Sequence, residues 1–341
     1  MSRYSSKLVS EFSRCGCQKV IPSKRGVFIK SHNFQWNIIE KDFCSMRYPK
    51  VKTLIVVHTA IPHFHARQAH RKMYGKRFYE KVNSAHLFTF CLLFNQWIHA
   101  MGVASLFFVG MPSDEEQQMQ IRNESETYHD IIQQDFIDTY RNLTWKAISW
   151  LQYVNEFCEE VEFILKIDDD VVFDLIAIES YLRKKSPVAE EANSNVNMML
   201  CSLFADSHLL PIRDSKSKWG VTKEEYAPDF FYPYCRGIFY LMPRRTAVNL
   251  LNASIGEKFF WFKFFTQLLQ IDDYFITGHL SHKIGVVFDN IMSFQSGKEQ
   301  LLAGRSWLWV SDSQNMTEAV NIWQKLEESH KNASSSVVLS L

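Results

Sequence analysis

The sequence predicts an α/β fold in which a mixed, mostly parallel central sheet is flanked by helices. Short apolar runs rich in β-branched and aromatic residues recur along the chain, and segments with helical periodicity lie between them. Such alternation favours parallel strands, because parallel neighbours must be joined by crossover connections, which are usually helices. Apolar residues make up 46% of the 341-residue chain and include 27 Phe, which is enough for a sizeable core.

The first expected strand covers residues 54–58, so we expect the folded domain to begin near Val51. A helix should follow, and it carries Arg67 and Arg71 four residues apart on one face. Two arginines placed in this way are either solvated charges or contacts to a phosphate or uridine beside the first strand. The second strand is expected at residues 105–109.

The middle of the chain continues the alternation. The polar stretch 112–130 is expected to form a loop and the start of a helix. An amphipathic helix is predicted at residues 142–157, because its apolar residues recur every three or four positions. The next expected elements are strands at residues 161–167, 198–204, 237–242 and 284–289 and a helix at residues 244–251.

Charge and cysteine content exclude several classes of protein. The chain carries 38 Lys and Arg against 37 Asp and Glu, so its net charge gives no reason to expect nucleic acid or an anionic membrane surface as a partner. Its seven cysteines show no repeated metal-binding spacing, which argues against a zinc site.

Five Asn-x-Ser/Thr sequons indicate a secretory protein, because such sites are glycosylated only in the secretory lumen. Some of the cysteines should then form disulfides. Against this, the sequence contains no window of about 20 apolar residues and no visible signal-peptide core. The candidate glycosylation sites are Asn123, Asn142, Asn252, Asn315 and Asn332.

Three adjacent carboxylates, Asp168, Asp169 and Asp170, come directly after the expected strand at residues 161–167. Ligands of open α/β sheets collect at the carboxyl ends of strands, and three carboxylates that repel one another need a positive charge nearby. Mn²⁺ or Mg²⁺ carrying a diphosphate fits such a site. The alternative is a solvated turn or a helix N-cap, but apolar residues on both sides of the triplet favour the metal interpretation.

A second acidic pair, Asp272 and Asp273, also lies in an apolar setting. Transfer of a sugar requires a carboxylate to accept the proton of the attacking hydroxyl, while a metal stabilises the departing diphosphate. The two acidic sites would supply both functions. The alternative for this pair is N-capping of the helix that follows.

Seven segments, in order between about Val51 and Asn290, resemble the motifs of the β-1,3-galactosyltransferase family. The most specific are residues 135–146 (DFIDTYRNLTWK) and residues 163–171 (FILKIDDDV). The others are residues 67–75 (RQAHRKMYG), 107–110 (FFVG), 126–132 (ETYHDII), the pair KW at 218–219 with YPYCRG at 232–237, and residues 272–278 (DDYFITG).

This resemblance implies a GT-A fold, a UDP-galactose or UDP-N-acetylglucosamine donor, Mn²⁺ (or Mg²⁺), inversion at the anomeric carbon and a glycan acceptor on protein or lipid, extended in β-1,3 linkage. It also implies a membrane protein of the Golgi apparatus, although no anchor is visible. The expected domains are a stem-like region at residues 1–50, the catalytic domain at residues 51–300 and a C-terminal extension at residues 301–341.

The resemblance also implies roles for individual residues. Asp170 and Asp168 would bind the metal, Asp168 or Asp169 would contact the ribose or the donor sugar, and Asp273 would be the catalytic base. The positions near the nucleotide are Arg67, Arg71, Asp135 and Lys146, where a solvated lysine is the alternative for Lys146. The donor or acceptor pocket would be lined by Trp219, Tyr234, Gly237 and Asp272, with core packing as the alternative for Tyr234.

Some residues depart from the family pattern. Met73 and Tyr74 replace Thr-Trp, Asp272 replaces Glu, and Phe239 stands where a small residue is expected and could fill space that a sugar needs. Two alternatives therefore remain beside an active transferase. One is a catalytically inactive relative that binds nucleotide sugar or glycan. The other, a metal-dependent hydrolase, is weaker because His208, His279 and His282 form no strand-end pair with the triplet.

Overall fold

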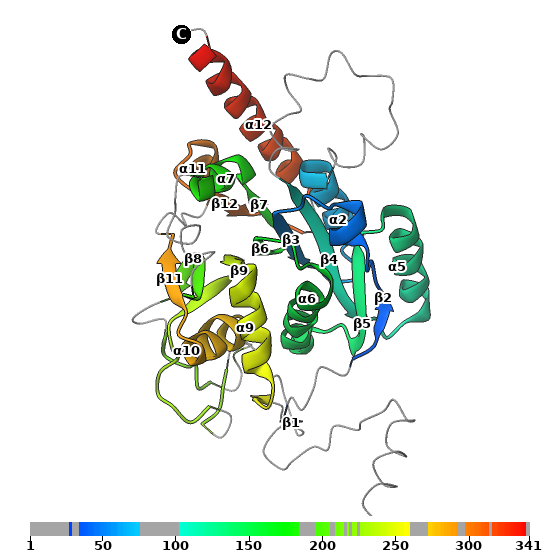
Figure 1. Ribbon diagram of the computed structural model, residues 1–341, viewed down its shortest axis with the longest axis vertical. Coiled ribbons are helices and arrows are strands. Elements are labelled where there is room, and N and C mark those ends of the chain that lie inside the picture. The colour runs from blue at the N-terminus through cyan, green and yellow to red at the C-terminus, as the bar shows by residue number, and fades with distance from the viewer. Residues whose placement is uncertain are drawn as a thin grey trace, which may run out of the picture.

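The computed structural model describes residues 27–28, 34–75, 102–183, 195–204, 209–214, 217, 220–223, 226–259, 272–291, 297–313 and 316–338. Its centre is an eight-stranded sheet (Figure 1). In spatial order the strands are β11 (Val287–Asn290), β8 (Met198–Phe204), β9 (Tyr234–Pro243), β6 (Phe163–Asp168), β3 (Thr53–His58), β4 (Val103–Met111), β5 (Ile131–Ile137) and β2 (Trp36–Ile38).

The sheet is mixed and mostly parallel, as expected. β3 runs parallel to both β4 and β6, β4 is parallel to β5, and β11 is parallel to β8. β9 runs antiparallel to both of its neighbours, β6 and β8, and the edge strand β2 runs antiparallel to β5. The amino end of β9 therefore lies at the edge of the sheet where β3, β6 and β8 end.

The central strands are apolar on both faces because helices cover both faces of the sheet. All six residues of β3 are buried. Ile55 and Val57 belong to one core cluster, whereas Leu54 and Val56 belong to the cluster on the opposite face. This burial on both faces explains why the strand reads as a continuous apolar run in the sequence.

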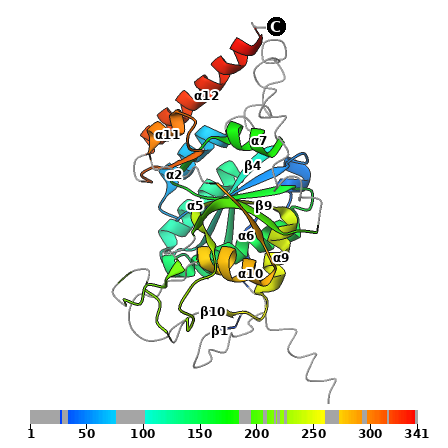
Figure 2. The same cartoon turned by 90° about the vertical axis from the view of Figure 1, so that its left-hand side faces the viewer.

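Two layers of helices flank the sheet (Figures 1 and 2). One face carries α6 (Leu143–Phe157), α9 (Arg244–Ser254), the π-helical turn η6 (Tyr274–Leu280) and α10 (Ser281–Lys283). The other face carries α2 (Phe64–His70), the π-helical turn η2 (Arg71–Gly75), α5 (Glu115–Tyr128), α7 (Leu175–Arg183), α11 (Lys298–Leu302) and α12 (Thr317–Val338). No helix in the described part of the chain is long and apolar enough to cross a membrane.

The ordered fold extends beyond both of the expected domain boundaries. Before residue 51, strand β2 pairs with β5, and Cys44 forms a disulfide with Cys158 at the end of α6. After residue 300, β12 (Leu308–Val310) pairs with β7 (Val171–Phe173), the strand that follows the acidic triplet. Helix α12 packs its apolar residues into the core and then projects away from the domain (Figure 1, red).

The polar stretch 112–130 is mostly helix rather than loop, and β5 was not anticipated. Helix α5 starts at the N-cap Asp114, whose Oδ1 accepts a hydrogen bond from the Glu116 N–H. Its buried face is largely polar, so it shows little apolar periodicity. In β5 the buried residues Gln133 and Gln134 interrupt the apolar run, and both amides are hydrogen-bonded within the protein.

Candidate functional site

The acidic triplet lies at the carboxyl edge of the sheet, where Asp168 is the last residue of β6. Lys166, which is 2% exposed, donates hydrogen bonds to Asp168 Oδ1 at 2.7 Å and to the carbonyl oxygen of Gly237 in β9 at 2.6 Å. Burial opposes the charge of Lys166, but the carboxylates of Asp168, Asp272 and Asp273 outweigh burial and raise its pKa. This buried ammonium group therefore joins the triplet to β9.

Asp169 is bound within the protein. The Thr59 hydroxyl donates to Asp169 Oδ2 at 2.5 Å, and His63 Nδ1 lies 2.9 Å from the same oxygen. The hydrogen bond and charge of Asp169 outweigh the partial burial of His63 and raise the pKa of the imidazole. Asp169 thus fastens the loop after β3 to the triplet.

Asp170 is the carboxylate that is least well satisfied. Burial, followed by the charges of Asp168 and Asp169, raises its pKa to about 7. Its Oδ1 is buried and has no hydrogen-bond partner in the described part of the structure. A buried acceptor without a donor, next to a second carboxylate that is partly exposed, fits an oxygen ligand of a divalent cation.

No cluster of three or more His, Cys, Asp or Glu side chains suited to a metal occurs within the described ranges. A cation held by Asp170 and Asp168 would therefore need most of its other ligands from a bound molecule or water. This is the arrangement that Mg²⁺ and Mn²⁺ adopt with nucleotide phosphates.

The second acidic pair lies beside β9. Asp273 immediately precedes η6 and makes no side-chain capping hydrogen bond, so the capping alternative is wrong for this residue. Burial, and after it the Asp272 charge, raises the pKa of Asp273 well above its ordinary value. Burial also raises the pKa of Asp272, to about 6, although Lys166 opposes the shift.

Gly237 is needed to accommodate Asp273. A Cβ atom at position 237 would lie 1.7 Å from Asp273 Oδ1, which is far inside any tolerable contact. The Gly237 backbone therefore contacts Asp273, while its carbonyl accepts from Lys166. Through these contacts β9 connects the triplet to the second acidic pair.

His58 is a site residue that was not singled out in the sequence. It ends β3, lies opposite Asp168 in the parallel ladder, and is 5% exposed. Its Nδ1 is 3.8 Å from Asp272 Oδ2, and its Nε2 has no hydrogen-bond partner among the described residues. Burial, with the charges of Lys166 and Lys146, lowers its pKa, so the ring is neutral near pH 7. A polar residue at the end of an apolar strand was the available signal.

Arg67 and Arg71 share a helix face, as predicted, but neither is solvated. Arg67, 1% exposed, donates to both carboxylate oxygens of Glu124 and to the carbonyl oxygens of Ala60 and Ile61. Arg71 makes a bidentate pair with Asp130, with both bonds at 2.8 Å. Arg67 therefore holds the loop after β3 against α5, and Arg71 holds η2 against Glu124 of α5 and Asp130 beyond it.

Lys146 is 2% exposed, so its solvated alternative is wrong. Its Nζ donates to the Thr59 carbonyl oxygen at 2.5 Å and to Asp138 Oδ1 at 2.9 Å, which joins the loops after β3 and β5. Asp135 is exposed on β5, and its Oδ1 accepts from the Gln35 N–H next to β2.

The expected pocket residues are only partly described. Trp219 lies outside the described residues. Tyr234 is half-buried and packs against an aromatic cluster formed by Tyr226, Phe231 and Tyr274. Phe239 is 1% exposed and belongs to the core on one face of the sheet, so its ring fills core space and does not project into a pocket.

Two disulfides, Cys44–Cys158 and Cys201–Cys235, are typical of a protein that folds in an oxidising compartment. Four of the five sequons fall in the described ranges. Asn123, Asn252 and Asn332 are exposed, whereas Asn142 is half-buried and donates to the Ile137 carbonyl oxygen. Asn315 lies outside the described residues.

A mixed sheet that gathers an acidic triplet and a second acidic pair at one edge fits the glycosyltransferase that the sequence predicts. The chain belongs to the galactosyltransferase family, whose sequence model matches residues 92–291. Family membership confirms the resemblance carried by the motifs of residues 135–146 and 163–171.

Three relatives illustrate the similarity. Beta-1,3-galactosyltransferase 1 of Mus musculus and of Homo sapiens are each 26% identical over 261 residues, which is 76% of this chain and 68% of theirs. Beta-1,3-galactosyltransferase 5 of Homo sapiens is 31% identical over 150 residues, covering 44% of this chain and 46% of its own. Among solved structures, the galactosyltransferase LgtC in complex with donor and acceptor sugar analogues covers 81% of this chain and 95% of its own, at 13% identity and a TM-score of 0.34.

Proposed function

We propose that the protein transfers galactose or N-acetylglucosamine from a UDP-sugar to a glycan hydroxyl in β-1,3 linkage, with inversion and with a divalent metal. The observation that carries the proposal is the connection between the two acidic sites through Lys166 and Gly237. The diphosphate of a donor bound at the triplet and an acceptor hydroxyl bound at Asp273 would then lie close together, on either side of the start of β9. Inversion needs these two groups on opposite sides of the anomeric carbon.

Asp273 is the proposed base. Inverting transfer requires a carboxylate that takes the proton of the acceptor hydroxyl as that oxygen attacks. The raised pKa of Asp273 makes it a stronger base than an exposed aspartate, because burial and Asp272 favour the bound proton. Lys166 keeps a positive charge close enough to limit that shift.

Asp170 and Asp168 are the proposed holders of Mn²⁺ or Mg²⁺. When bound, such an ion stabilises the negative charge of the departing diphosphate. Asp168 also keeps its contact with Lys166, which orients one of its oxygens. Asp169 and Lys146 are proposed to support the site without contacting the metal, since both hold the loop after β3 through Thr59.

The donor and acceptor sugars should lie on the β9 side of the triplet. Tyr234 presents an aromatic ring there, and Trp219 is a second candidate from the sequence, because aromatic faces pack against the C–H groups of sugars. The exposed sequons and the two disulfides support a glycoprotein of the secretory pathway, and we place it in the Golgi apparatus on the strength of the family.

The test is UDP release from a panel of UDP-sugars with Mn²⁺, with and without candidate glycan acceptors. Acceptor-stimulated release from UDP-galactose or UDP-N-acetylglucosamine is the expected result. Binding of a UDP-sugar without release from any member of the panel would instead favour the inactive relative. Asp273→Asn is the matched control for chemistry that does not use this site.

A further inference from the structure

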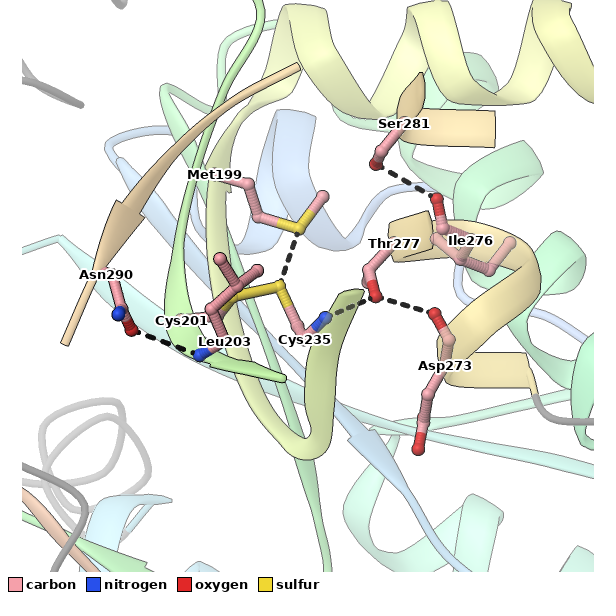
Figure 3. The surroundings of a disulfide bond; sticks show 9 residues. All are labelled: Met199, Cys201, Leu203, Cys235, Asp273, Ile276, Thr277, Ser281 and Asn290. Atoms are coloured by element: carbon pink, nitrogen blue, oxygen red, sulfur yellow. Dashed lines mark hydrogen bonds between the residues drawn. A yellow bond between two sulfur atoms is a disulfide. The ribbon is translucent and has the colours of Figure 1, made fainter. Parts of the chain in front are cut away.

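The backbone of Asp273 is bound to β9 through one buried hydroxyl group, that of Thr277. Thr277 is fully buried in η6. Its Oγ1 accepts a hydrogen bond from the Cys235 N–H at 2.9 Å and donates one to the Asp273 carbonyl oxygen at 2.6 Å (Figure 3). A single side chain thus joins the residue that precedes the π-helical turn to the strand beside it.

The end of β9 that donates this hydrogen bond, at Cys235, is itself constrained. Cys235 forms a disulfide with Cys201 of β8, so its main chain is tied to the neighbouring strand as well as to the β-ladder (Figure 3). Gly237, two residues further along β9, provides the surface against which the Asp273 carboxylate lies. Asp273 is therefore fixed at two points of the same strand, its carbonyl through Thr277 and its carboxylate by contact with Gly237.

Thr277 lies in an unusual kind of helical turn. Residues Tyr274–Leu280 form a π-helical turn, which is wider than an α-helical turn and frequently occurs at functional sites. In a buried helix, a threonine hydroxyl that bonds the carbonyl four residues earlier satisfies only its own helix. Here the same oxygen also accepts from another element, so the hydroxyl has a role beyond its own solvation.

We propose that Thr277 is a positioning residue that sets the place of the Asp273 carboxylate relative to the metal side of the site. The inference rests on the proposed function, because it assumes that Asp273 is the base. Thr277 touches no reacting atom and acts only through Asp273. Loss of its hydroxyl should allow the start of η6 to move away from β9 while the triplet keeps its own contacts.

Three variants of the full chain separate this role from a merely structural one. Thr277→Val keeps the shape and removes the hydroxyl, and Thr277→Ser restores the hydroxyl. Ser281→Ala is the matched control, because Ser281 is also fully buried and its Oγ donates to the carbonyl oxygen of Ile276, five residues earlier in η6 (Figure 3). Within the described chain, Ser281 makes no hydrogen bond to Asp273 or β9.

Each variant is characterised by four measurements. These are the kcat and acceptor KM of UDP-sugar transfer, the affinity for UDP with Mn²⁺ and the midpoint of thermal unfolding. We expect kcat to fall about tenfold or more in Thr277→Val, since misplacement of a reacting group by a fraction of an ångström has effects of that order. UDP affinity should stay near that of the wild type. Thr277→Ser should recover most of the rate, and Ser281→Ala should keep its kcat even if its midpoint falls.

The proposal is overturned if Thr277→Val keeps its kcat, if Thr277→Ser is as slow as Thr277→Val, or if Ser281→Ala slows transfer equally. Should Thr277→Val not fold, Thr277→Ala assayed at low temperature takes its place with the same expected outcomes. A wild-type rate in Asp273→Asn would instead refute the proposed base itself. The failure of the positioning role and the failure of the proposed function therefore give different results.

Discussion

Replacement of Gly237 by alanine is predicted to displace the Asp273 carboxylate while leaving the sheet intact. The added Cβ would lie 1.7 Å from Asp273 Oδ1 and 2.0 Å from its Cγ. Cβ contacts essentially never fall below 3.0 Å, so the oxygen must retreat by at least 3.0 minus 1.7, or 1.3 Å. Because the clashing atoms belong to the end of a half-buried side chain, Asp273 should yield before β9 does.

The expected effect is on turnover rather than on nucleotide binding. A displacement of about 1 Å at a reacting group lowers a rate on the order of 10²-fold, which corresponds to about 2.7 kcal/mol of transition-state stabilisation. We expect kcat of acceptor-dependent UDP release to fall by about that factor. UDP affinity in Mn²⁺, measured by titration calorimetry, should change little, because the triplet retains its contacts to Thr59 and Lys166.

Gly285→Ala is the control for a simple loss of stability. Gly285 has a φ of +66° and open space around its Cβ position, so alanine there introduces backbone strain without a collision. That strain costs about 1 kcal/mol of folding stability and should leave kcat unchanged. If Gly237→Ala turned over as fast as Gly285→Ala, the contact between Gly237 and Asp273 would have no catalytic meaning, and the reasoning would be refuted.

Three further outcomes are expected. Asp273→Asn should keep UDP affinity and lose about 10²-fold or more in kcat, as a lost general base does; loss of UDP binding would assign the residue to structure instead. UDP should bind more tightly with Mn²⁺ than in EDTA, and calorimetry should show this difference vanish in Asp170→Ala; equal wild-type affinities would contradict the metal role. Although burial opposes its charge, hydrogen bonds from Lys283 and His279 lower the pKa of Glu257 below its ordinary value of 4.5. The stabilisation that Glu257 provides should therefore be complete above pH 4.5 and be lost as the pH falls through the lower pKa of the folded state. The free energies of unfolding of wild type and Glu257→Gln, measured with denaturant, should become equal in acid. A difference that stays constant with pH would refute the pairing.

The strands buried on both faces were predictable because burial on both faces produces an unbroken apolar run. β3 and β6 are examples, and the amphipathic α6 was predictable for the same kind of reason. β5 was not, because its buried Gln133 is satisfied by the Gly110 carbonyl and by Gln118, partners that only the folded chain supplies. Helix α5 was only partly predicted, because its buried face consists mainly of hydrogen-bonding side chains and shows little apolar periodicity.

The parts of the site that consist of acidic residues adjacent in the sequence were predictable. The acidic triplet and the pair at Asp272 are visible as carboxylates in apolar surroundings. The Arg67 spacing correctly gave its helix face, but its partner Glu124 comes 57 residues later, so the choice between a ligand and an internal ion pair could not be made from the helix alone. Thr277 falls inside the motif at residues 272–278, but the motif does not reveal its role, which depends on the hydrogen bond between η6 and Cys235.

The direction of β9 divides the site between separate stretches of the chain. Among the described strands, β9 alone has two neighbours and runs antiparallel to both, so its amino end rather than its carboxyl end reaches the working edge of the sheet. The acidic triplet and its partners Thr59 and His63 come from segments that leave β3 and β6, whereas Tyr226, Phe231 and Tyr234 belong to the segment that enters β9. On the proposed roles, changes in the entering segment would alter which glycan is accommodated while the residues proposed to hold the nucleotide stay the same.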